Sequence, residues 1–193
     1  MACHSQVAAT TTRRVWRSLL RIAIAEVACS LEERGVLKRH RHDYADRMIV
    51  HLEDVVGHDL HDDLKDFYHE RIEQVGEFRA TWPGWDSYHA RWGDELTLEL
   101  LPAKAIPLFG DGCGNWWGVD LTSNDQVPAV YFFDHEDGFE RPQYAAGSSL
   151  GAFLLLLADH DRAFQEKWPT GWELRIDPDI DKCPRAPPIW LAG

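Results

Sequence analysis

The chain lacks the cysteine patterns that build disulfide frameworks or zinc sites. Its four cysteines (Cys3, Cys29, Cys113 and Cys183) lie far apart and form no C-x-x-C pair. Isolated cysteines of this kind are typical of reduced thiols in a cytoplasmic protein. We therefore expect a cytoplasmic location, no structural disulfide, and no metal or other cofactor.

Long apolar runs are also missing. No stretch is long enough to span a bilayer, so no membrane contact is expected. A twin arginine at positions 13–14 superficially resembles an export signal, but Arg17 and Arg21 interrupt the apolar residues that follow. Their spacing instead predicts an amphipathic helix over residues 13–35 that ends at Gly35.

Positive charge is scarce in most of the chain. The formal net charge is −12; residues 1–47 carry +4 and residues 48–193 carry −16. A body this acidic repels nucleic-acid phosphates, so no nucleic-acid partner is expected. It suits a basic protein partner, because complementary charge speeds encounter and rejects wrong partners. The simpler alternative is that the negative charge only keeps the protein in solution. The net charge by itself favours this alternative over partner binding.

Motifs for catalysis and phosphate binding are absent too. There is no G-x-S-x-G nucleophile elbow. The glycine-rich segment IPLFGDGCGNWWGVDLT (106–122) matches neither G-x-G-x-x-G nor the P-loop. A strand-like segment follows its glycines, whereas both motifs need a helix whose N-terminus holds the phosphate. We predict a tight β connection around Asp111 and Asn115, and no catalytic residue.

Histidine is abundant, and its distribution supports an alternative function as an enzyme. Segment 40–70 interleaves six histidines with aspartates: His40, His42, His51, His58, His61 and His69. A metal-dependent hydrolase could use such residues. However, a metal site needs convergent ligands and partners that orient each imidazole, and spacing shows neither. A solvated polar face is the favoured interpretation, so no metal ligand is assigned.

Periodicity divides the chain into a helical half and a strand-rich half. Helical spacing continues over residues 43–78 with a break near Gly57, and a turn at Pro83 follows. Period-two segments then predict strands, and a last helical pattern begins with serines suited to capping; the segments are 96–101, 116–121, 129–134 and the helix 148–164.

This order predicts an α+β fold with N-terminal helices, an antiparallel or mixed sheet of about four to six strands, and a closing helix. We expect three parts. They are an N-terminal helical extension (1–45), an α+β domain (46–165) and an irregular proline-rich tail packed on that domain (166–193).

Acidic and aromatic residues gather around the glycine-rich segment. Alternation places Trp117 on one face of a strand and Trp116 on the other, so one tryptophan belongs to the core while the other can face a partner. Which one does so stays open at this point. Aromatic anchors with surrounding charge are typical of protein recognition. The candidate protein-binding residues are Asp111, Asn115, Trp116, Trp117, Asp120, Asp134, His135, Glu136 and Asp137.

Four segments together resemble the motifs of one known family. DLHDDLKDFY resembles its L-P-x-D-L-K-x-F-Y segment, with His61 in place of the proline. AIPLFGDGCGN resembles its I-P-hydrophobic-G-x-D-G-G-G-N turn, with Cys113 in place of a glycine. AVYFFDHED and SLGAFLLLL are similar to its V-Y-x-x-D-H-E strand and its closing helix. These are the motifs of the SUKH superfamily of cell-wall-assembly regulators and bacterial immunity proteins, which the chain resembles over about residues 50–158.

The resemblance implies a non-enzymatic protein-binding domain. Bacterial members commonly bind and neutralise a cognate toxin domain, often a nuclease, so the expected partner is a basic toxin domain. The alternative within the same class is a regulatory scaffold of the cell-wall-synthesis type. The oligomeric state is left open.

Overall fold

The computed structural model describes residues 23–41, 43, 45–80, 104–121 and 128–185. Its elements in chain order are α2 (Ile24–Glu33), β1 (Leu37–Arg39), α3 (Ala45–Val56), α4 (Asp62–His69), β2 (Ile72–Val75), β3 (Phe78–Ala80), β4 (Ala105–Gly110), β5 (Trp116–Asp120), β6 (Val130–Phe133), β7 (Tyr144–Gly147), α5 (Leu150–Gln165), and the 3₁₀ helices η1 (Trp172–Arg175) and η2 (Ile180–Lys182).

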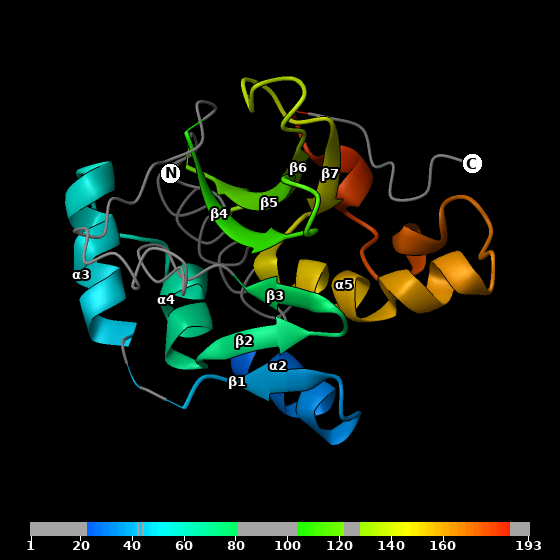
Figure 1. Ribbon diagram of the computed structural model, residues 1–193, viewed down its shortest axis with the longest axis horizontal. Coiled ribbons are helices and arrows are strands. Elements are labelled where there is room, and N and C mark those ends of the chain that lie inside the picture. The colour runs from blue at the N-terminus through cyan, green and yellow to red at the C-terminus, as the bar shows by residue number, and fades with distance from the viewer. Residues whose placement is uncertain (1–22, 42, 44, 81–103, 122–127, 186–193) are drawn as a thin grey trace, which may run out of the picture.

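The described strands form one antiparallel sheet in the order β1 to β7 (Figure 1). Each strand pairs with its neighbours in the sequence. The connection between β2 and β3 has only two residues, and its first, Gly76, takes a φ of +57°, a conformation that glycine adopts at little cost. The predicted α+β fold is confirmed, and its described sheet has seven strands rather than four to six.

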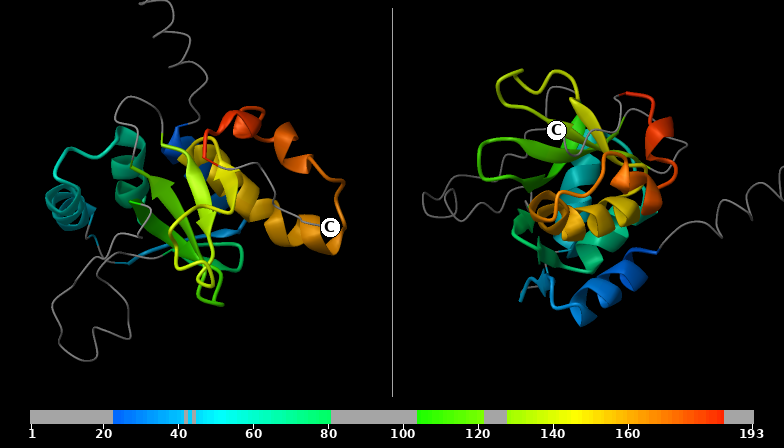
Figure 2. Two further views of the ribbon diagram at one scale, coloured as in Figure 1. Left: turned by 90° about the horizontal axis from the view of Figure 1, so that it is seen from above. Right: turned by 90° about the vertical axis from the view of Figure 1, so that its right-hand side faces the viewer.

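Helices α4 and α5 lie against one face of the sheet (Figures 1 and 2). This face carries Phe109 and Trp117, whose rings contact these helices. The Phe109 ring lies 6.0 Å from that of Phe67 in α4 and 5.7 Å from that of Phe153 in α5. Helix α2 packs in turn on α4 and α5. The predicted N-terminal helix is therefore present where the structure describes it, and its predicted residues 13–22 lie outside the described part.

Helix α5 confirms the predicted closing helix. The Oγ atom of Ser149 accepts a hydrogen bond from the backbone N–H of Ala152 at 3.2 Å, as an N-cap does. Its first turns bury Leu150, Phe153 and Leu154 against the sheet. The entry to the helix lies so close to β7 that a Cβ on Gly147 would meet the Phe153 backbone nitrogen at 2.8 Å.

The helical prediction for 43–78 is wrong beyond His69. Helices α3 and α4 lie in this range, but Arg71 takes a φ of +54°, and β2 begins at Ile72. Tyr68 and Ile72 are both fully buried, one in the helix and one in the strand. Their four-residue spacing therefore resembles a continuous helical face. Strand β1 was not predicted, because three residues carry too little periodicity.

The segment after α5 is more regular than predicted, since it contains η1 and η2. Trp172 and Ile180 are 1% and 0% exposed and belong to the core. The carboxylate of Asp177 accepts hydrogen bonds from the backbone N–H and the hydroxyl of Ser148, each at 2.6 Å. The division of the chain into three parts stays a prediction, and so does the strand at 96–101, which lies outside the described residues.

None of the described helices combines the length and the apolar character that crossing a membrane requires.

Candidate protein-binding site

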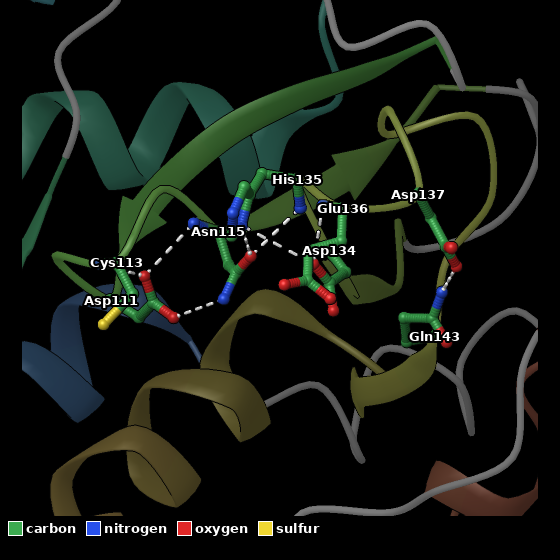
Figure 3. A network of polar contacts seen from close by, with 8 residues as sticks. All are labelled: Asp111, Cys113, Asn115, Asp134, His135, Glu136, Asp137 and Gln143. Carbon is green, nitrogen blue, oxygen red and sulfur yellow. Dashed lines mark hydrogen bonds and ion pairs between the residues drawn. The ribbon is translucent and has the colours of Figure 1, made fainter.

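The turn between β4 and β5 is organised by the side chain of Asp111. Its Oδ1 accepts hydrogen bonds from the backbone N–H of Cys113 at 2.7 Å and of Asn115 at 3.1 Å (Figure 3). Gly112 and Gly114 take φ values of +79° and +102°, a region that favours glycine. The glycines therefore shape the backbone around one carboxylate, as the predicted β connection requires.

Asn115 links this turn to the loop that follows β6. Its Nδ2 donates to Asp111 Oδ2 at 2.7 Å, and its Oδ1 accepts the backbone N–H of His135 at 3.0 Å. The Nδ1 atom of His135 lies 2.7 Å from the same oxygen. An amide oxygen only accepts, so this contact requires a proton on Nδ1. The imidazole also lies over Gly114, where a Cβ would be 3.5 Å from His135 Cγ.

The loop after β6 presents acidic side chains from an ordered backbone. Asp134 Oδ1 accepts the backbone N–H of Glu136 at 2.8 Å and lies 3.5 Å from His135 Nδ1. Asp137 is hydrogen-bonded to the amide of Gln143, and its Oδ2 lies 3.9 Å from Arg141 Nη2. His135, Glu136 and Asp137 are exposed. We call residues 134–137 the acidic loop.

The two tryptophans of β5 divide as the alternation predicts, and the structure decides which is which. Trp117 is 2% exposed and lies in the core, where its ring is 5.4 Å from Phe132 and 5.0 Å from Phe78. Trp116 is half-buried and lies over Gly110, where a Cβ would meet its Cζ3 at 2.9 Å.

The Trp116 face of the sheet is less open than its aromatic content suggested. Tyr131 and Phe133, which belong to the same face of neighbouring β6, are 1% and 0% exposed. Trp116 is thus the one of these three that keeps accessible surface.

The structure thus joins five of the nine predicted residues through hydrogen bonds and one His–Asp contact at 3.5 Å: Asp111, Asn115, Asp134, His135 and Glu136. Asp137 lies in the same loop (Figure 3), and Trp116 begins the strand that follows the turn. Trp117 is buried in the core and does not belong to this surface. Asp120 ends β5, and its side chain lies outside the described part. Sequence reasoning missed Gln143, which follows the loop and binds Asp137; no motif marks it.

The histidine-rich segment does not form a cluster in the part of the chain that the structure describes. His61 caps α4, because its Nδ1 accepts the backbone N–H of Asp63 at 3.2 Å. His58 and His69 are exposed. Among the described residues, no three His, Cys, Asp or Glu side chains are grouped so that they could hold a metal ion.

The architecture is therefore an α+β domain with a long antiparallel meander and an acidic loop anchored to a glycine-rich turn. The model of the SMI1/KNR4 family (SUKH-1) matches residues 45–155, and the chain belongs to this family. Neither a curated protein nor a solved structure matches the chain.

Proposed function

We propose that this chain is a non-catalytic, cytoplasmic immunity protein that binds and neutralises a basic toxin domain, most simply a nuclease. Membership of the SMI1/KNR4 family supports a role in protein–protein interaction. The −16 charge of residues 48–193 supports a basic partner. A nuclease site attracts phosphate, and an acidic inhibitor can imitate that charge.

The acidic loop is the surface on which this proposal depends most. Its backbone is held by Asn115, so Glu136 and Asp137 present charge from a preformed position. Preorganised groups lose little conformational entropy on binding. Trp116, half-buried beside the turn, is suited to be the aromatic anchor, since hot spots are enriched in tryptophan.

The decisive experiment measures binding to the toxin domain encoded beside the gene, in a catalytically inactive form, by calorimetry at two salt concentrations. We expect tight, salt-sensitive binding. E136Q/D137N weakens it about ten-fold, in line with two rim charges. The matched control is E26Q/E33Q, which removes two exposed charges from α2 and leaves the affinity unchanged.

Two results would contradict the proposal. Absence of any toxin gene beside the gene, together with binding to a housekeeping partner, would favour the regulatory scaffold. Equal weakening by the acidic-loop and α2 variants would show that overall charge, rather than this loop, carries the interaction.

A further inference from the structure

After α5 the chain folds back beside the end of this helix (Figure 1), and a second candidate site lies here. It is an open cavity of about 470 Å³, a size typical of sites that bind organic ligands or anchor side chains. All of its lining residues lie beyond residue 155, where the family match ends; they are Asp159, Trp168, Pro169, Trp172, Arg175 and Ile176.

The cavity wall is mainly aromatic and aliphatic. The rings of Trp168 and Trp172 meet edge to face, with centroids 5.2 Å apart. The Trp168 indole N–H donates to Glu166 at 2.8 Å, so its polar group already has a partner. The elements around the cavity also carry two of the exposed large apolar side chains of the described chain, Phe164 (68%) and Leu174 (41%). An apolar occupant is therefore favoured.

The charged residues that line the cavity are Asp159 and Arg175. Asp159, the carboxylate of the lining, already pairs with Arg34 at 2.7 Å and with Arg162 at 3.3 Å. The Arg162 guanidinium also lies 4.8 Å from the centre of the Trp168 ring. Arg175 lies 5.7 Å from that ring and has no ion pair with a carboxylate of the described residues.

We propose that this cavity docks a segment of a partner protein in which a bulky apolar side chain stands next to a carboxylate. The apolar side chain packs on the half-buried Trp168, whose ring meets the buried Trp172, and the carboxylate pairs with Arg175. The charge argument selects this occupant, since a basic segment would meet an unpaired arginine. The exposed Arg175 distinguishes this surface from the acidic loop, and the inference holds whether or not the toxin partner is the right one.

The test titrates the ¹⁵N-labelled full chain with three capped tetrapeptides and follows the indole N–H signals of Trp168 and Trp172. The peptides are acetyl-Ala-Trp-Asp-Ala-amide, its Asn version, and a version with Ala in place of Trp. We expect saturable shifts of both indole signals with the Trp-Asp peptide. Binding of the Trp-Asn peptide is about two- to five-fold weaker, the range for one exposed ion pair, and the Ala-Asp peptide gives no shift.

The variant R175Q tests the ion pair separately from the apolar packing. Arg175 is exposed, so its replacement leaves the apolar wall of the cavity in place. It should bind the Asp and Asn peptides equally. The matched control R79Q removes an exposed arginine from β3 and should keep the preference. The proposal is overturned if the indole signals do not shift, if the wild-type protein binds both peptides equally, or if R175Q keeps the preference.

Discussion

The side-chain oxygen of Asn115 lies within hydrogen-bonding distance of two nitrogens of His135, the backbone N at 3.0 Å and Nδ1 at 2.7 Å. Because Asn115 Nδ2 simultaneously donates to Asp111, one amide joins the glycine-rich turn to the acidic loop. The candidate site is therefore assembled from two loops that lie 20 residues apart in the sequence.

Replacing this amide should loosen the site and destabilise the fold. N115A removes the contacts to both loops and should lower the free energy of unfolding by about 1–2 kcal/mol. N115D should cost at least as much at pH 7, because it places a second carboxylate beside Asp111. Urea unfolding measures both variants, with Q165A at the exposed end of α5 as a neutral control. Unchanged stability in N115A would show that the amide does not couple the loops.

The pair Ser148–Asp177 should be more costly to break, because Asp177 is 3% exposed. D177A leaves both the backbone N–H and the hydroxyl of Ser148 without their acceptor, and we expect a loss of about 3 kcal/mol. S148A removes only the hydroxyl contact and should cost about 1 kcal/mol. A double-mutant cycle by urea unfolding checks the coupling between the two side chains. Additive effects would contradict a direct interaction.

Alanine substitutions at two glycines distinguish a steric loss of stability from a loss caused by backbone strain. At Gly147 a Cβ would meet Phe153 Cβ at 2.7 Å and its backbone nitrogen at 2.8 Å. G147A should therefore cost about 2–3 kcal/mol, because neither β7 nor the α5 entry can shift freely. A Cβ on Gly112 would meet no atom within 4 Å beyond its chain neighbours, but φ at this residue is +79°. G112A should cost about 1 kcal/mol from backbone strain alone. Thermal or urea unfolding that ranked G112A as the worse variant would contradict this assignment.

Glu53 should make the contact between α3 and α4 dependent on pH. Its Oε1 accepts from Lys65 Nζ at 2.6 Å and from the backbone N–H of Leu60 at 3.0 Å. The hydrogen bond from Lys65, followed by that from Leu60, lowers the pKa of the Glu53 carboxyl below its ordinary value of 4.5. The stabilisation is therefore fully present above pH 4.5 and is lost as the pH falls through the lowered pKa.

The measurement is the stability difference between wild type and E53Q from pH 7 to pH 2.5. The difference should be largest at neutral pH and should shrink below pH 4.5. The control E73Q changes an acidic side chain on β2 that has no hydrogen bond or ion pair with another side chain of the described residues, and its stability difference should not follow this course. A wild-type advantage over E53Q that grew with acidity would reverse the sign argued here.

Local patterns sufficed to predict several elements. Strands β5 and β6 and helix α5 follow from alternation, from helical spacing and from the serine cap, all of which act within a few residues. The turn at Asp111 was predictable for the same reason, since its glycines and its side-chain acceptor lie within five consecutive residues. The helical prediction beyond His69 was wrong, because Tyr68 and Ile72 are buried residues of two different elements, α4 and β2.

The sequence by itself determined the family segments, the α+β order of elements, the acidic charge and the residues that surround the turn. Only the tertiary structure decided that Trp117 belongs to the core while Trp116 stays half-buried, because alternation gives two faces and packing against Phe153 and Phe78 chooses between them. The contact between Asn115 and His135, and the cavity between Trp168 and Arg175, likewise depend on chain segments that meet only after folding.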